Sequence, residues 1–143
     1  MDQYIEFLGN HYMLTTAWVV LFFLLVMSWV SAATSPIKLV STHDLTMLVN
    51  RSNGQILDIR QASDFKKGHI TDSINLTLDK ITSGQFGALE KHKSNPIVVV
   101  CNAGMSAKTA AKLLSKAGFE QVSVLQGGIQ TWNSANLPVV SKK

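Results

Sequence analysis

The sequence predicts an α/β protein with a central parallel sheet and helices on both faces of it, preceded by one transmembrane helix. Two observations lead to this fold class. An uncharged apolar run occupies residues 13–33, and after it short apolar β-branched segments alternate with helical patterns. Such alternation is typical of βαβ units, which build parallel sheets. With 143 residues, the chain has room for one domain of this kind after the apolar run.

The apolar run at residues 13–33 has the length of a membrane-spanning helix. At ~1.5 Å of rise per residue it covers about 30 Å, the thickness of the hydrocarbon core of a bilayer. A cleaved signal peptide is the alternative, but the run is long and no basic residue precedes it. We therefore predict a short extracytoplasmic leader at 1–12, a transmembrane helix at 13–33, a linker at 34–37 and a domain at 38–143.

Charge is distributed unequally on the two sides of the apolar run. The leader carries Asp2 and Glu6, whereas all 13 basic residues and the other seven acidic residues follow the run, which gives that part a formal charge of +6. The positive-inside rule then puts the domain in the cytoplasm and the N-terminus outside. A reducing compartment also suits an unpaired cysteine. We expect a single-pass protein of the inner (plasma) membrane.

The elements of the domain follow from local patterns. Ser41 is the expected N-cap of a helix over 41–50, with Asp44 in its first turn and Asn53-Gly54 as its end. The clearest strand is the β-branched run 96–100, which is typical of a buried parallel strand. Further strands are expected at 55–58, 73–76 and 121–125, and further helices at 62–67, 78–81, 86–92 and 107–117.

Cys101 is the single cysteine of the chain and directly follows the strand at 96–100. A short flexible segment, Asn102 to Ser106, separates it from the next helix. Ligand sites of parallel sheets lie at the carboxyl ends of the strands, where loop N–H groups and a helix dipole stabilise an anion. A thiolate held there is a good nucleophile. The alternative is a buried cysteine that acts as a small hydrophobic residue.

The residues around Cys101 exclude two other cysteine chemistries. A cysteine phosphatase needs an arginine six residues after the nucleophile to clamp phosphate, but that residue is Ala107 and no arginine follows Cys101. A redox dithiol needs a second cysteine. A Cys–His pair requires His43, His69 or His92 to lie nearby in space. The histidines lack metal-ligand spacing and the lysines lack an aromatic platform, so we expect no metal, no cofactor and no nucleic-acid partner.

Three motifs, in this order, resemble the signatures of rhodanese-type sulfurtransferases. The segment 57–70 is similar to the first signature, a strand ending in Asp-x-Arg, then an acidic-aromatic pair and Gly-His-Ile. The segment 101–106 resembles the six-residue catalytic loop, and 124–132 resembles the closing strand, Gly-Gly turn and Trp-bearing helix. The resemblance spans 38–140 and, together with the apolar run, indicates a membrane-anchored, single-domain rhodanese of bacterial type.

The resemblance implies roles for the loop and its neighbours. Cys101 is the implied catalytic residue, which accepts a sulfane sulfur as a persulfide and passes it to a thiol or another nucleophile. The implied substrate-binding cradle is formed by backbone N–H groups, with Gly104 at positive φ and Ser106 as a helix cap; its members are Asn102, Ala103, Gly104, Met105 and Ser106.

Two charged residues, Asp58 and Arg60, are candidate supporting residues of this site. The alternative is that they belong to an ion-pair network without a catalytic role. Because Arg60 and Asp64 are four residues apart, we expect these two side chains to pair. Phe65 and Trp132 are the expected aromatic anchors of the core.

The loop composition bears on the sulfur donor. Many thiosulfate-using members carry basic residues in or beside the loop, where this chain has Asn102, Met105 and Ala107. We therefore expect thiosulfate, a dianion, to be a poor donor compared with a polysulfide or a protein persulfide. The expected partners are a small-molecule or protein sulfur donor, a thiol acceptor and the membrane. The alternative function is a non-catalytic module that holds a membrane-protein partner, for which Ser28-x-x-x-Ala32 provides a small-residue helix contact.

Overall fold

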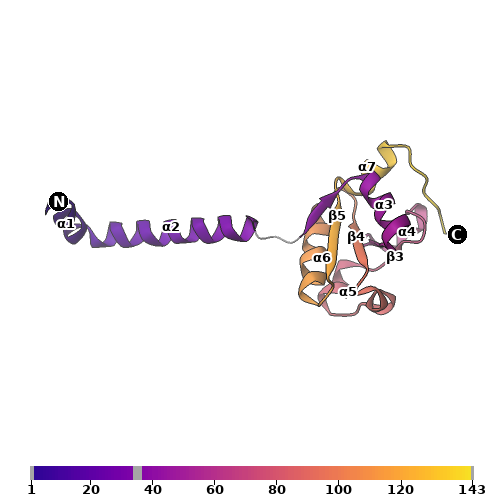
Figure 1. Cartoon of the computed structure of the whole chain (residues 1–143), viewed down its shortest axis with the longest axis horizontal. Coiled ribbons are helices and arrows are strands. Elements are labelled where there is room, and N and C mark those ends of the chain that lie inside the picture. The colour runs from indigo at the N-terminus through magenta and orange to yellow at the C-terminus, as the bar shows by residue number, and fades with distance from the viewer. Residues whose placement is uncertain (1, 34–36, 143) are drawn as a thin grey trace. The chain divides into compact units, whose positions relative to one another are not determined.

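The computed structural model of the chain describes residues 2–33 and 37–142, which belong to two compact units, residues 1–35 and 36–143. The first unit consists of the helices α1 (Asp2–Asn10) and α2 (Tyr12–Ala33), shown in Figure 1. Apart from Ile37, the predicted linker at 34–37 lies outside the described residues.

Helix α2 is long and apolar enough to cross a membrane. Its window Tyr12–Val30 has a mean hydropathy of 2.2, and none of that window is buried inside the structure. Large apolar side chains such as Phe22, Leu24 and Leu25 are exposed. Water does not favour a helix that is apolar on every side, whereas the hydrocarbon core of a bilayer accepts one. By length and composition, α2 therefore qualifies as a membrane span.

A five-stranded sheet with the order β1-β5-β4-β2-β3 lies at the centre of the second unit. All neighbouring strands are parallel, which confirms the predicted fold class. The strand β4, which the sequence marked most clearly, is central and fully buried. The strands are β1 (Lys38–Val40), β2 (Gln55–Asp58), β3 (Ile74–Asn75), β4 (Pro96–Val100) and β5 (Gln121–Leu125).

Helices cover both faces of the sheet. Alternate residues of a strand point to opposite faces, and accordingly Val99 of β4 belongs to one apolar cluster and Val98 and Val100 to another. The first cluster includes side chains of α5 (Leu78–Thr82), η1 (Gly87–His92) and α6 (Met105–Lys116). The second includes side chains of α3 (Thr42–Ser52) and α7 (Gly128–Ser134). The remaining helix, α4 (Ala62–Lys67), buries Phe65.

Local hydrogen bonds explain the limits of α3. The Ser41 hydroxyl accepts a hydrogen bond from the Asp44 N–H at 3.1 Å, and the Asp44 carboxylate accepts one from the Ser41 hydroxyl at 2.8 Å and one from the Ser41 N–H at 3.2 Å. This is a capping box. The hydrogen bond from the Ser41 side chain, followed by that from its backbone, lowers the pKa of Asp44. The helix ends at Ser52, and its C-cap Asn53 has a φ of 53°. The predicted N-cap is confirmed, and the helix extends two residues beyond the predicted end.

Candidate active site

Cys101 lies at the carboxyl end of β4, just before the loop that leads into α6. The residue is 5% exposed, and its Sγ accepts a hydrogen bond from the backbone N–H of Gly104 at 2.9 Å. Helix α6 begins at Met105, so its N-terminus adjoins the sulfur. An N–H donor and a helix N-terminus both favour negative charge. The local structure is therefore suited to a thiolate or a persulfide anion.

Close backbone packing shapes the Cys101 loop. Gly104 has a φ of 94°, as expected, and a Cβ at this position would lie 3.3 Å from the backbone nitrogen of Gly127. A Cβ at Gly128 would overlap the carbonyl oxygen of Cys101. With glycine there, the N–H groups that begin α7 reach the loop: Ile129 donates to the carbonyl of Cys101 at 2.8 Å and Gln130 to that of Asn102 at 3.3 Å. The Gly-Gly turn thereby holds the loop from behind.

A hollow of about 410 Å³ lies in front of Cys101. Three parts of the chain form its walls: the segment after β2, the start of α5, and the Cys101 loop with the first turn of α6. The lining residues are Ile59, Arg60, Gln61, Asp64, Leu78, Asp79, Cys101, Asn102, Ala103, Met105 and Ser106. The structure thus brings Arg60 and four of the five predicted cradle residues to the hollow, with Gly104 buried behind them.

The predicted capping role of Ser106 is wrong. Helix α6 begins earlier than the sequence pattern indicated, at Met105 rather than Ala107, and its N-cap is Gly104, which has no side chain to accept a hydrogen bond. Ser106 lies inside the first turn and is exposed. Met105, the first residue of the helix, is 82% exposed at the edge of the hollow. The helix starts early because the positive φ of Gly104 already turns the chain into the helix.

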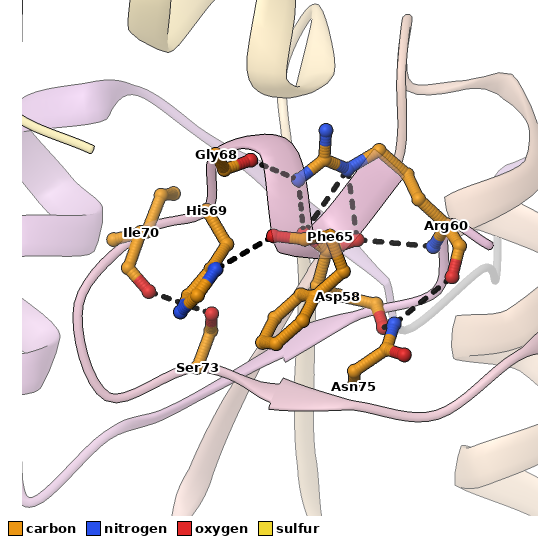
Figure 2. A network of polar contacts seen from close by, with 8 residues as sticks. All are labelled: Asp58, Arg60, Phe65, Gly68, His69, Ile70, Ser73 and Asn75. Carbon is orange, nitrogen blue, oxygen red and sulfur yellow. Dashed lines mark hydrogen bonds and ion pairs between the residues drawn. The ribbon is translucent and has the colours of Figure 1, made fainter. Parts of the chain in front are cut away.

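Arg60 pairs with Asp58 rather than with Asp64, which makes the predicted Arg60–Asp64 pair wrong. Figure 2 shows that Nε and Nη2 of Arg60 bond the two carboxylate oxygens of Asp58 at 2.6–3.1 Å, while Nη2 also bonds the carbonyl of Gly68 at 2.8 Å. Asp58 is 1% exposed, and a buried carboxylate needs a charged partner. Asp64 is instead 3.6 Å from Lys67 in a partly exposed pair. The burial of Asp58, and not the four-residue spacing between Arg60 and Asp64, therefore decided which carboxylate Arg60 contacts.

Further polar contacts fix the segments beside the hollow. The Asn75 amide donates to the carbonyls of Asp58 at 3.1 Å and Arg60 at 2.9 Å (Figure 2). His69 is buried, its Nδ1 lies 2.7 Å from the Phe65 carbonyl, and its ring stacks on that of Phe65 at 3.8 Å. Asn75 thus ties the end of β2 to the segment that contains Arg60, whereas His69 is held by Phe65.

Neither a histidine nor a metal-ligand set adjoins Cys101 in the part of the chain that the structure describes. Among the described residues no histidine lines the hollow, so none is placed there to pair with Cys101. Within residues 2–33 and 37–142, no group of three His, Cys, Asp or Glu side chains is placed to hold a metal ion. The groups that the structure places at the hollow are the Cys101 thiol, the loop N–H groups and the lining side chains.

The sequence reasoning missed Asp79 as a lining residue. It lies in the first turn of α5, which follows β3. Because β3 pairs with β2, its carboxyl end opens onto the same edge of the sheet as the carboxyl ends of β2 and β4. A residue directly after a predicted strand was the available signal, since such positions collect at one edge of a parallel sheet. The two-residue length of β3 made that signal weak.

The chain belongs to the rhodanese-like family. The family model for the rhodanese-like domain matches residues 41–135, which include strands β2 to β5 and the Cys101 loop. The chain is similar over its whole length to the uncharacterized protein YibN of Escherichia coli, with 39% identity over 143 residues and complete coverage of both proteins. It is also 35% identical over 102 residues to the thiosulfate sulfurtransferase GlpE of Shewanella oneidensis, which covers 71% of this chain and 98% of that protein.

Solved structures agree with this assignment. A rhodanese-related protein from Thermoplasma volcanium aligns with a TM-score of 0.62 and 25% identity, over 73% of this chain and 99% of that one. A thiosulfate sulfurtransferase from Pseudomonas aeruginosa aligns with a TM-score of 0.65 and 26% identity, over 74% of this chain and 20% of that one. Both matches cover a share of this chain close to that of its second unit.

Proposed function

We propose that this protein is a membrane-tethered sulfurtransferase that moves sulfane sulfur through a persulfide on Cys101 to a thiol or another nucleophile. The observation that carries the proposal is the position of the Cys101 sulfur, which accepts the Gly104 N–H at 2.9 Å beside the N-terminus of α6 and borders an accessible hollow. The similarity to the sulfurtransferase GlpE supports the same chemistry.

The reaction proceeds in two displacements at sulfur. First, the Cys101 thiolate attacks the outer sulfur of a persulfide donor R–S–SH. The S–S bond of the donor breaks, its electron pair leaves with R–S⁻, and Cys101 becomes a persulfide. In the second step an acceptor thiolate attacks the outer sulfur of that persulfide, takes it with its proton, and releases the Cys101 thiolate. Sulfur and charge balance in each step, so no external oxidant or reductant is needed.

The charge around Cys101 favours a donor other than thiosulfate. The loop residues Asn102 and Met105 bring no positive charge, and the guanidinium of Arg60 is already engaged by Asp58 and Gly68. A dianion would therefore gain little beyond the loop N–H groups. We propose a polysulfide or a protein persulfide as the donor.

The proposed tether is α2, with the N-terminus outside and the domain in the cytoplasm. The support is the apolar length of α2 and the positive charge of the chain that follows it. In intact cells, a membrane-impermeant maleimide is expected to label a Gln3→Cys variant and to spare Cys101 until lysis. A Cys101→Ser background separates the two labels. Labelling of Cys101 in intact cells, with protection at position 3, would reverse the proposed orientation.

Sulfur loading tests the proposed chemistry. The full chain in a neutral detergent is incubated with thiosulfate, with polysulfide or with a low-molecular-weight persulfide, and intact mass spectrometry measures the addition of one sulfur atom. We expect loading by polysulfide and persulfide, release of the sulfur to a thiol, and loss of both in Cys101→Ser, because a hydroxyl cannot hold a persulfide. If wild type and Cys101→Ser behave alike with every donor, the enzyme proposal fails and a non-catalytic interaction module becomes the better account.

A further inference from the structure

We propose that the carboxylates of Asp64 and Asp79 make the hollow selective for thiol acceptors that carry a positive charge next to the thiol. This inference rests on the proposed function and names the acceptor class of the same site. It starts from the walls of the hollow, which contain three ionisable side chains besides Cys101 in the described part of the chain: Arg60, Asp64 and Asp79.

The positive charge of Arg60 is not available to a substrate. Its side chain is 8% exposed, and both Nε and Nη2 donate to Asp58, which contributes an equal negative charge. The pair is therefore neutral as a unit. Since Nη2 also bonds the carbonyl of Gly68 at 2.8 Å, turning the guanidinium toward the hollow would break several hydrogen bonds. Arg60 shapes the wall without supplying a free cation.

The two carboxylates, in contrast, keep their charge at the hollow. Asp64 has a side chain that is 43% exposed, and its partner Lys67, at 3.6 Å, is an exposed lysine outside the lining. Exposed pairs of this kind are weak, so Lys67 offsets that charge only in part. Asp79 is exposed on the wall that the start of α5 forms. Both side chains carry a formal negative charge.

The hollow therefore has two electrostatic zones. At its floor, the Gly104 N–H and the N-terminus of α6 favour an anion on the sulfur. Around the approach, the two carboxylates are negative, and the exposed side chain of Met105 adds no charge. In the transfer step the Cys101 persulfide reacts in its protonated form, so the field around the approach comes from the two carboxylates. They attract a positively charged group on an acceptor and repel a negatively charged one.

The step concerned is the second displacement. The acceptor thiolate R′–S⁻ forms a bond to the protonated outer sulfur of the Cys101 persulfide, the Cys101–sulfur bond breaks, and its electron pair remains on the Cys101 thiolate. The product is the acceptor persulfide R′–S–SH. The charged group of R′ takes no part in the bonds that change. Its effect on the transfer rate therefore reports the electrostatic field of the side chains that line the hollow.

The experiment compares acceptors that differ in charge. The full chain in a neutral detergent is loaded with one sulfur atom from polysulfide, freed of donor, and mixed with cysteamine, 2-mercaptoethanol or 3-mercaptopropionate at low salt. The rate at which the loaded mass disappears is measured for wild type and for Asp64→Asn/Asp79→Asn. For each thiol, the ratio of the wild-type rate to the variant rate cancels the intrinsic nucleophilicity of that thiol.

A control variant removes the same total charge elsewhere. Glu90→Gln/Glu120→Gln changes two exposed residues that precede β4 and β5, at the sheet edge opposite Cys101. We expect the wild-type-to-variant rate ratio for Asp64→Asn/Asp79→Asn to be highest for cysteamine, roughly threefold lower for 2-mercaptoethanol and roughly threefold lower again for 3-mercaptopropionate. The control variant is expected to give ratios near one, and added salt should bring all ratios toward one.

The outcomes separate this inference from the proposed function. Equal ratios for the three thiols, or the same trend in the control variant, would overturn the charge selectivity while leaving sulfur transfer intact. Failure of wild type to load or to release sulfur, with the same result in Cys101→Ser, would overturn the proposed function itself.

Discussion

Replacing Arg60 with methionine removes the charged partner of the buried Asp58 carboxylate. Loss of one partner of a buried ion pair costs ~3–5 kcal/mol, and we expect Arg60→Met to destabilise the domain by about 3 kcal/mol, the low end of that range. Asp58 would lose the hydrogen bonds from Nε and Nη2 of Arg60 at 2.6–3.1 Å. It would keep the backbone N–H of Arg60 at 3.0 Å, which the substitution does not touch. That remaining donor is the reason for choosing the low end.

Urea unfolding of the fragment 36–143 measures the loss in free energy of unfolding. The fragment is suitable because these residues form one compact unit. In addition, the alignment with GlpE covers 98% of that protein, which therefore consists of little more than this domain. Trp132 is the single tryptophan of that fragment and is buried, so its fluorescence reports unfolding. Lys67→Met is the matched control: it breaks the exposed pair with Asp64 and should change the free energy of unfolding by less than ~1 kcal/mol.

A double variant tests the cause of the loss. Asp58→Asn/Arg60→Met leaves no buried charge, so it should recover part of the stability lost in Arg60→Met. Two results would refute the view that burial of Asp58 determines its partner. One is a loss in free energy of unfolding below about 1 kcal/mol in Arg60→Met, and the other is a loss in Lys67→Met that equals the loss in Arg60→Met.

Three further outcomes are expected. Gly128→Ala should destabilise the domain by about 1–3 kcal/mol and slow sulfur transfer, because φ is 62° there and the added Cβ would overlap the Cys101 carbonyl. The control is Gly84→Ala, which is also at positive φ but has open space around it. It should destabilise the domain less and leave the transfer rate unchanged. Hydrogen bonds from Ser41 lower the pKa of Asp44 in the folded state, so their contribution to stability is present above the ordinary carboxyl pKa of 3.8 and is lost as pH falls through the folded pKa. The free energy of unfolding of Asp44→Ala should therefore approach that of wild type in acid, and a constant difference from pH 7 to pH 3 would contradict this. Met105→Arg changes an exposed position at the hollow and should raise kcat/KM for thiosulfate about tenfold, because it adds a cation near the dianion. Steady-state kinetics measures this effect, with Met105→Gln as the uncharged control.

Elements that local sequence determines were predicted well. The β-branched run of β4, the lone cysteine after it and the Ser41 N-cap with Asp44 in the first turn were recognised because each depends on residues within a few positions of one another. Strand β1 was not predicted. It has three residues, two of them exposed, and it is a strand because Leu39 and its neighbours pair with β5, far away in the sequence.

The sequence by itself determined the α/β class, the apolar helix, and the place of Cys101 between a buried strand and a helix N-terminus, because periodicity and composition carry that information locally. Only the tertiary structure decided which charges meet. Arg60 turned to Asp58 because that carboxylate is buried, and Asp79 reached the hollow because β3 pairs with β2. Electrostatic partners depend on burial and on distance through space, and a linear spacing of residues contains neither quantity.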